Sequence, residues 1–252
     1  MVNVWHTGSM KSTGIRKERE RKFREELILD TAATMLLNEG YLGLNLDRLA
    51  EKVEYSKGTL YLHFDSKEDL ILAIAARNLK ERVDLFEHAV TLSGRPREKA
   101  VALGVADLVF LYHHPVHFQI EPLVKQTSIW ERGSKARRQD FDLHMKLCLG
   151  ILRRLMEDGI KQGDLHLAKI KPESVTFGLW AMSYGAYSLA RSEALLKAIG
   201  LEKPMRTLIQ DRSFFLDGVG WKPLSTDWDY GATLERVFQD IFPGIAREKI
   251  GL

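Results

Sequence analysis

Apolar residues recur along most of the chain at intervals of three and four positions. Leu27, Thr31 and Met35 follow this spacing near the amino terminus. Alternation of apolar and polar residues, the pattern of a half-buried strand, is almost absent. The pattern therefore predicts an all-α fold of about nine helices. The helical spacing returns late in the chain with larger side chains: Phe177, Trp180, Tyr184 and Tyr187.

Turn-forming residues separate the expected helices. Gly40 is a natural left-handed stop for the first helix, and Asn45 is an N-cap for the second. Residues 213–231 contain too many turn formers for an ordinary connection. Eight of the expected helices have assigned bounds: residues 16–38, 46–53, 57–64, 67–90, 99–113, 134–162, 172–197 and 232–241.

Two of these helices, 46–53 and 57–64, are short and are separated by only "EYS". Two short helices joined by such a turn form a helix-turn-helix, whose second helix enters the major groove of DNA. On a helical wheel Leu60 and Phe64 lie together and face the first helix. The opposite side and its flank carry Lys57, Gly58, Thr59, Tyr61, Leu62 and His63.

The segment "LNLDRLAEKVEYSKGTLYLHFDSKEDLI" (44–71) resembles the helix-turn-helix signature of the TetR family of bacterial transcriptional regulators. A later segment, "LMEDGIKQGDL" (155–165), is similar to the end of the family's seventh helix. The resemblance implies a DNA-binding domain at 16–66, a ligand-binding and dimerisation domain at 67–252, and a flexible arm at 1–15. Asn45 stands where the family has a capping threonine, and Gly58 opens the recognition helix. By motif position the DNA contacts would be Thr59, Tyr61, His63 and Lys67 to phosphates, and Lys57 and Leu62 to base edges.

One position departs from the family pattern. The turn usually contains glycine, whereas this chain has Glu54. A glutamate with a positive φ is strained, and its charge is unfavourable beside phosphates. We therefore expect either a reshaped turn or a Glu54 side chain that points outward.

Overall charge says little about partners, because the net charge of the 252 residues is only +3. The positive charge is local, since residues 11–24 hold seven basic and two acidic side chains. Such an arm can follow a phosphate backbone, although a solvated terminus is the alternative for residues 1–15. Cys148 is the only cysteine, which excludes an internal disulfide and a thiolate zinc site. A signal peptide and a membrane-spanning run are not apparent, so a cytoplasmic protein is expected.

The late helix at 174–196 is apolar on more than one side. A helix of this kind must be buried against two surfaces, here a pocket in its own domain and a second subunit. We expect a homodimer formed by helices 172–197 and 232–241, with Gly185 where the backbones meet. Ordinary core packing is the alternative interpretation of the aromatic stripe.

A pocket framed by aromatic side chains would favour a mostly apolar ligand with one hydrogen-bonding or ionic end. Asp107 stands alone in an apolar run and needs a partner, either Arg191, a histidine or a cationic ligand. The histidines of "LYHHPVHFQIEP" (111–122) have three alternative interpretations: a metal site, a cluster that contacts the ligand, or a structural kink in the helix. The expected ligand contacts are Asp107, Phe110, His113, His117, Phe141, Met145, Phe177, Trp180, Tyr184 and Tyr187.

These features together predict a DNA-binding transcriptional regulator. The favoured hypothesis is a dimeric repressor that a small, mostly apolar effector releases from a palindromic operator. The alternative is a DNA-binding regulator controlled by a protein partner. Trp221 and Trp228 in the turn-rich segment would either anchor this partner or cover the core of the dimer. Sequence motifs of phosphate-binding loops, nucleophile elbows and zinc proteases are missing, so neither enzymatic activity nor a cofactor is expected.

Overall fold

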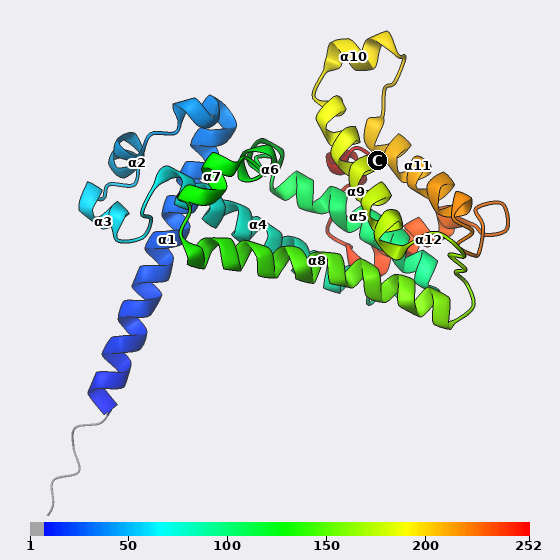
Figure 1. Cartoon of the computed structure of the whole chain (residues 1–252), viewed down its shortest axis with the longest axis horizontal. Coiled ribbons are helices and arrows are strands. Elements are labelled where there is room, and N and C mark those ends of the chain that lie inside the picture. Colours follow the sequence, from blue (N-terminus) through cyan, green and yellow to red (C-terminus); the bar gives the residue numbers. More distant parts are fainter. Residues whose placement is uncertain (1–7) are drawn as a thin grey trace, which may run out of the picture. The chain divides into compact units, whose positions relative to one another are not determined.

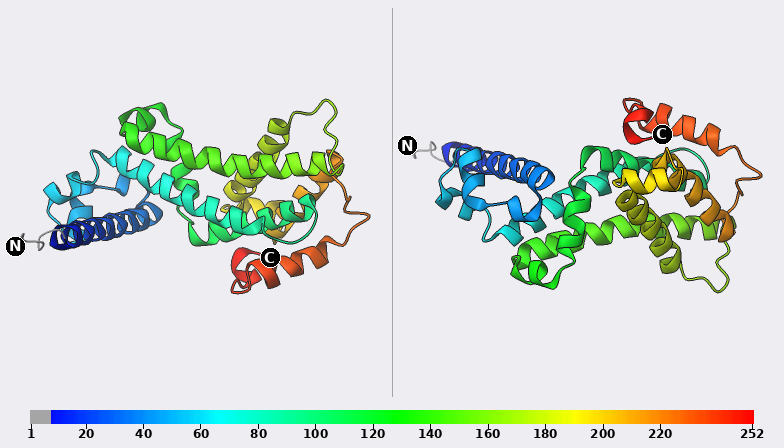
Figure 2. Two further views of the ribbon diagram at one scale, coloured as in Figure 1. Left: turned by 90° about the horizontal axis from the view of Figure 1, so that it is seen from below. Right: turned by 90° about the horizontal axis from the view of Figure 1, so that it is seen from above.

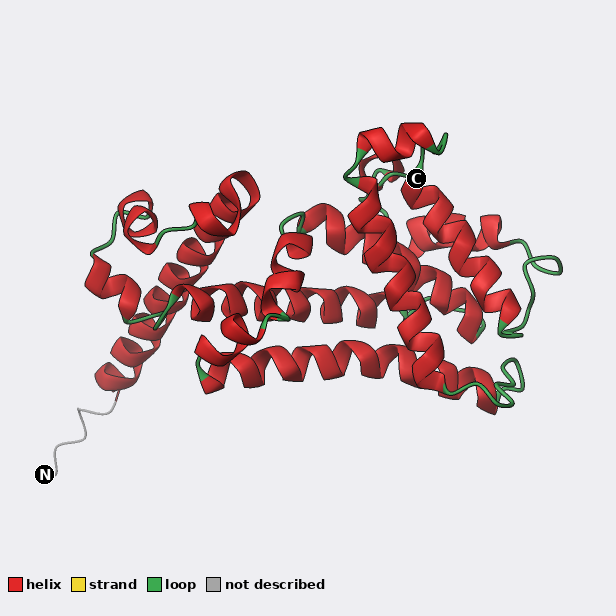
Figure 3. Cartoon of the chain, turned by 45° about the horizontal axis from the view of Figure 1, so that its top comes forward, coloured by secondary structure: helices red, strands yellow, loops and turns green. Residues whose placement is uncertain are grey.

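The computed structural model describes the backbone of residues 8–252 and the side chains of residues 14–252 (Figure 1). The first seven residues of the expected arm at 1–15 lie outside this range. The remainder of that arm belongs to the first helix, which begins at Gly8. The described residues contain helices and loops and no strand (Figure 3), which confirms the all-α prediction.

The described part of the chain forms twelve α-helices followed by two short helical turns. At Gly40 the backbone of α1 leaves helical geometry with φ 69°, as the sequence predicts. The helices are α1 (Gly8–Gly43), α2 (Leu46–Lys52), α3 (Lys57–Tyr61), α4 (Lys67–Ala89), α5 (Pro96–His113), α6 (His117–Val124), α7 (Thr127–Arg132), α8 (Lys135–Lys161), α9 (Pro172–Ala190), α10 (Glu193–Ala198), α11 (Pro204–Gly218) and α12 (Tyr230–Arg236), then a π-helical turn (Val237–Ile241) and a 3-10 turn (Arg247–Ile250).

Two differences from the sequence-based expectation affect the function. The expected helix at 172–197 is interrupted after Ala190, because the Ser192 hydroxyl accepts a hydrogen bond from the Leu195 amide and caps α10 as a separate helix. A further helix, α11, occupies Pro204–Gly218, where no helix was expected and where the supposed turn-rich segment begins. Proline in its first turn provides a start signal for this helix.

The chain divides into two compact units, which we describe separately. The first runs to Ala75 and includes Gln119–Arg138, and the second consists of Ala76–Phe118 and Gln139–Leu252. The expected boundary at residue 66 thus lies nine residues earlier, and a later segment returns to the first unit. Among the described residues no helix has the length and apolar character needed to cross a bilayer.

The core of the second unit is built around α5, most of whose side chains are buried. Helix α12 and the 3-10 turn Arg247–Ile250, orange to red in Figure 2, pack against α5. The loop between α11 and α12 is fixed to the same core: Arg97 is buried and donates hydrogen bonds to the Trp221 carbonyl and to Asp217. Trp221 itself is fully buried. Trp221 therefore serves the core, and the hypothesis that it anchors a partner is wrong.

Candidate DNA interface and ligand pocket

Helices α2 and α3 form the expected helix-turn-helix, and side-chain caps fix the start of each. Asn45 Oδ1 accepts hydrogen bonds from the amides of Asp47 and Arg48, at 2.8 and 3.2 Å. Ser56 Oγ accepts one from the Thr59 amide at 3.1 Å. The inner faces also match the prediction, since Leu60 and Phe64 are buried together with Leu49, Ala50 and Val53.

The outward side of α3 carries the side chains that the helical wheel places there. Tyr61 is 50% exposed and Leu62 is 83% exposed. Gly58 is exposed, and a Cβ atom at this position would meet only the Ser56 hydroxyl within 4 Å. Lys57 is also exposed, with its ammonium 2.6 Å from an Asp47 carboxylate oxygen. These four residues form an accessible surface along α3 and its C-cap, which we call the α3 face.

Of the two outcomes expected for the turn between these helices, the structure shows an exposed Glu54 in a strained backbone conformation, not a reshaped turn. Glu54 has φ 57°, in the left-handed region that favours glycine. The residue is exposed, so its charge lies at the surface of the turn. The chain keeps the usual turn geometry and accepts a glutamate within it.

His63 does not belong to the α3 face. Its side chain is only 6% exposed, and its Nδ1 lies 3.7 Å from a Glu25 carboxylate oxygen on α1. Burial lowers the pKa of His63 below its usual value. The expected contact between His63 and a phosphate is wrong, because the imidazole points into the unit instead of out of it.

Lys67 and Thr59 are likewise engaged within the protein. The Lys67 ammonium donates a hydrogen bond to the Tyr41 carbonyl and lies 3.9 Å from the centre of the Tyr41 ring. Burial lowers the pKa of Lys67. Lys67 ties α4 to the end of α1, which contradicts its expected role as a phosphate clamp. Thr59 is half-buried, with its hydroxyl 2.9 Å from that of Ser56.

Arg137, at the start of α8, received no role from the sequence, yet it joins three parts of the first unit. Its guanidinium is 2.7 Å from a Glu25 carboxylate oxygen and 3.9 Å from one of Asp69. It also lies over the Phe64 ring at 5.2 Å. The charged run "KARRQD" looks like a solvated helix start, so nothing in the local pattern distinguishes Arg137.

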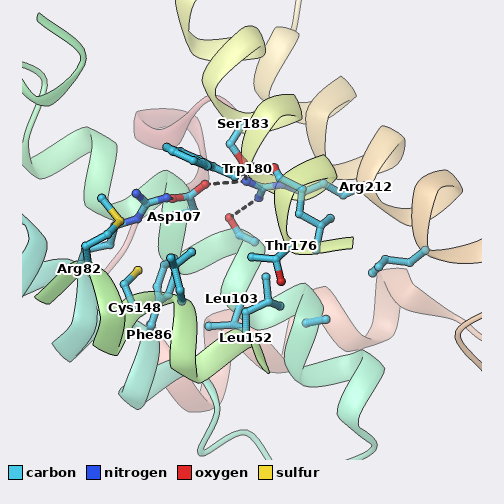
Figure 4. A pocket seen from close by; sticks show the side chains of 16 residues that line it. Arg82, Phe86, Leu103, Asp107, Cys148, Leu152, Thr176, Trp180, Ser183 and Arg212 are labelled. Atoms are coloured by element: carbon cyan, nitrogen blue, oxygen red, sulfur yellow. Dashed lines mark hydrogen bonds and ion pairs between the residues drawn. The ribbon is translucent and has the colours of Figure 1, made fainter. Parts of the chain in front are cut away.

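The second unit contains a cavity of about 100 Å³ lined by residues of α4, α5, α8, α9 and α11 (Figure 4). Asp107, Met145 and Trp180 line it as predicted. The other lining residues are Arg82, Phe86, Ala100, Leu103, Gly104, Cys148, Leu149, Leu152, Thr176, Leu179, Ser183, Arg212 and Leu216.

Several predicted ligand contacts lie elsewhere. Phe177 is 66% exposed and His113 is also exposed, so neither lines this cavity. Phe110 is buried beside the lining, with its ring centre 4.8 Å from that of His117. Phe141 and Tyr184 are half-buried outside the lining. The helical pattern assigns these residues to helices that line the cavity, but it does not establish which side of each helix faces the cavity.

Asp107 is the centre of a buried charge cluster at the cavity. Its carboxylate oxygens accept hydrogen bonds from Arg82 Nη2 at 2.5 Å, Arg212 Nη2 at 2.6 Å and the Tyr187 hydroxyl at 3.0 Å. Burial alone would raise the pKa of Asp107, but the two guanidinium groups lower it to about 2. The expected need for a partner is confirmed, whereas Arg191, exposed at the end of α9, is not that partner.

Both arginines were missed by the sequence analysis. Arg82 lies in the charged stretch "RNLKERVD", which looks like an ordinary solvated surface, and Arg212 lies in the unexpected helix α11. A search for basic residues on otherwise inward-facing helical positions would have identified Arg82. Arg212 could have been found only by first recognising helix α11 from the spacing of apolar residues in 204–218.

The histidines of residues 113–117 do not converge on a metal site. His114 Nε2 is 2.7 Å from a Glu81 carboxylate oxygen, and burial lowers the pKa of His114. His117 is buried against Phe110 and Phe118. Among the described residues no three histidine, cysteine, aspartate or glutamate side chains come together as metal ligands. The segment instead forms the bend between α5 and α6.

Comparison with known proteins identifies the helix-turn-helix. The family model described as "Bacterial regulatory proteins, tetR family" matches residues 28–74, which contain α2, α3 and the α3 face. Residues 28–74 therefore form the DNA-binding domain of the TetR family of transcriptional regulators. The family resemblance seen in the sequence is thereby confirmed.

Three relatives illustrate how far the similarity extends. The fatty acid metabolism regulator protein of Bacillus subtilis is 25% identical over 150 residues, which cover 59% of this chain and 73% of that protein. IcaR of Staphylococcus aureus, a negative regulator of the biofilm operon icaADBC, is 41% identical over 46 residues, or 18% of this chain and 25% of IcaR. The fatty acid degradation regulator FadR of Bacillus halodurans has the same fold, with a TM-score of 0.61, 16% identity, and coverage of 79% of this chain and 97% of FadR.

Proposed function

We propose that this TetR-family regulator is a dimeric repressor which a small, mostly apolar molecule releases from its operator. The observation that carries the proposal is the cavity of the second unit, whose lining is apolar apart from one compact cluster around Asp107. Apolar cavities with few, convergent polar groups are typical of small-molecule sites. The similarity to a fatty acid metabolism regulator supports an effector with an apolar part, and the similarity to a negative regulator supports repression.

For the DNA contacts we propose the α3 face. Lys57 and Leu62 would reach base edges in the major groove, and Tyr61 would donate a hydrogen bond to a phosphate. Gly58 would allow the backbone to approach the DNA closely. The exposure of these residues supports the assignment. We leave His63 out because its side chain is buried, and Lys67 because its ammonium binds the Tyr41 carbonyl.

Effector binding would act through the helices that line the cavity. About 100 Å³ of space is less than the roughly 300–1,000 Å³ of sites that enclose drug-sized ligands. A ligand of that size must therefore displace lining side chains such as Arg82 and Phe86, which lie on α4. Because α4 begins at Lys67 within the DNA-binding unit, its displacement would change the position of α3. The DNA-binding conformation would then become less populated.

For the dimer we propose an interface on α9 and α11, which pack against each other. Phe177 and Phe214 are both 66% exposed on these helices, and open space surrounds Gly185. If these side chains form one contiguous apolar patch across the two packed helices, the patch would mark an association surface. The residues 232–241 were expected to contribute, but Val237, Phe238 and Ile241 are buried within their own unit.

A screen by thermal shift on the purified full chain tests the proposal. A compound that raises the melting temperature is then added to the protein bound to a DNA fragment selected from a genomic pool. The proposal expects release of the fragment. Trp180→Ala should abolish the release of DNA by the compound. It should leave DNA binding itself intact, since Trp180 lies on α9 in the cavity lining and not on the α3 face. A compound that binds at Trp180 without affecting DNA binding would refute the proposal.

A further inference from the structure

The charged groups that line the cavity do not balance. Among the described lining residues two guanidinium groups, Arg82 and Arg212, face one carboxylate, Asp107. The remaining polar side chains in contact with this cluster, Tyr187 and Ser183, are hydroxyls. The cluster therefore carries one excess positive charge next to an apolar space, where an unpaired charge is costly.

The two arginines are held differently. Arg212 donates to the Gly104 carbonyl at 3.1 Å, to the Ser183 hydroxyl and to Asp107, so its guanidinium is fixed on three sides. Arg82 donates to Asp107, and its Nε is buried with no hydrogen-bond partner. A guanidinium has five N–H donors, so most donors of Arg82 are not used by the residues around it.

The surroundings of Arg82 combine this unused hydrogen-bonding capacity with apolar surface. Its guanidinium lies 5.2 Å from the ring centre of Phe86 and 5.3 Å from that of Phe110. Figure 4 shows Arg82, Asp107 and Arg212 in a row across the cavity, with Phe86, Leu103 and Leu152 on one side of that row. A ligand in this space would place its apolar groups against the aliphatic and aromatic side chains. Its polar end would lie beside the row of Arg82, Asp107 and Arg212.

We infer that the ligand is an anionic amphiphile, whose single negative group binds Arg82 while its apolar part fills the cavity. The inference rests on the proposed function and adds the charge of the effector. An anion would neutralise the excess charge and accept hydrogen bonds from Arg82, and such charge-assisted bonds are stronger than neutral ones. A carboxylate is the simplest group of this type, because a guanidinium can bind both of its oxygens.

Three probes with the same apolar chain test the charge: octanoate, octanol and octyltrimethylammonium. Their affinities for the full-length protein are measured by calorimetry without DNA. Octanoate should bind about tenfold or more tightly than octanol, and the cation should bind most weakly. In Arg82→Gln the preference of octanoate over octanol should disappear, while octanol affinity stays unchanged. Arg82→Lys keeps the charge and should retain part of the preference.

Asp107→Asn should change the affinity for octanoate in the opposite direction to Arg82→Gln. It removes the internal competitor for the arginines, so octanoate should bind more tightly than to the wild type. If this variant does not fold, Arg82→Gln decides alone, because it leaves Asp107 with Arg212 and Tyr187 as partners.

The outcomes separate the two proposals. Equal binding of octanoate and octanol to the wild type, or an undiminished preference in Arg82→Gln, would overturn the inference but leave an apolar effector in place. Failure of all three probes to bind the wild type would overturn the inference and count against the cavity as an effector site.

Discussion

Replacing Glu54 by glycine should make the protein more stable, although it removes a whole side chain. A non-glycine residue in the left-handed region costs about 1–2 kcal/mol, and Glu54 adopts φ 57° there. Glycine avoids this cost but loses about 0.5–1 kcal/mol through the greater freedom of the unfolded chain. The expected net gain in unfolding free energy is about 0.5–1 kcal/mol.

The gain can be measured by urea unfolding and by the melting temperature. For a chain of this size about 1 kcal/mol corresponds to roughly 2–4 °C, so Glu54→Gly should melt about 1–4 °C higher. Glu54→Gln keeps the strained backbone and removes only the charge, so it should not show this gain. Glu51→Gly is the matched control, because Glu51 is exposed in α2 and glycine within a helix is destabilising.

The same variants test the position of the turn relative to DNA. Both Glu54→Gly and Glu54→Gln remove a negative charge beside the α3 face, so both should bind DNA more tightly at low salt. The difference should shrink as salt screens the charge. The reasoning about backbone strain would be refuted if Glu54→Gly were no more stable than Glu54→Gln.

Three further predictions concern residues whose surroundings the structure defines. The two guanidinium groups lower the pKa of Asp107 in the folded state from its usual 3.8 to about 2. It therefore contributes stability above its unfolded pKa that is lost as pH falls towards 2, about 2 kcal/mol at 1.36 kcal/mol per pH unit. Denaturant titrations should show a steeper loss for the wild type than for Asp107→Asn between about pH 5 and pH 2, and parallel curves would contradict the cluster. Lys67→Met should lower the unfolding free energy without changing the salt dependence of DNA binding. Tyr61→Phe should instead weaken binding to all DNA sequences at unchanged stability. A flatter salt dependence of DNA binding in Lys67→Met would restore the role of Lys67 at a phosphate. Phe214→Glu should convert the proposed dimer to monomers in sedimentation, because it places a charge within the proposed α9–α11 interface. A variant that remains dimeric would move the interface elsewhere.

The helix-turn-helix could be predicted from the sequence because its determinants are local. The cap at Asn45, the inward position of Leu60 and the strain at Glu54 all depend on residues within a few positions of one another. Periodicity and turn chemistry carry this information.

His63 and Lys67 could not be placed in the same way. Both lie where the family motif puts phosphate contacts, but Glu25 and Tyr41 of α1 draw them into the unit. Packing against a distant segment overrides the outward side of a helical wheel. A motif match alone therefore does not establish that a side chain is accessible.

In the second unit the need for a charged partner was predictable and its identity was not. Asp107 is visibly alone in an apolar run, yet its partners Arg82 and Arg212 are 25 and 105 residues away in sequence. Phe177 was predicted to contact the ligand, but this aromatic residue of α9 is exposed and does not face the cavity. Only the packing of α9 against α11 decides which of its sides is free.

The central claim is that occupation of the cavity and binding of DNA are coupled. The most direct measurement is the affinity of the full-length protein for its selected DNA fragment, by fluorescence anisotropy, with and without a saturating cavity ligand. Coupling free energies between sites are typically about 1–3 kcal/mol. We therefore expect the ligand to weaken DNA binding by about fivefold or more in the wild type and to have no effect in Trp180→Ala. An affinity for DNA that stays the same when the cavity is saturated would contradict the account.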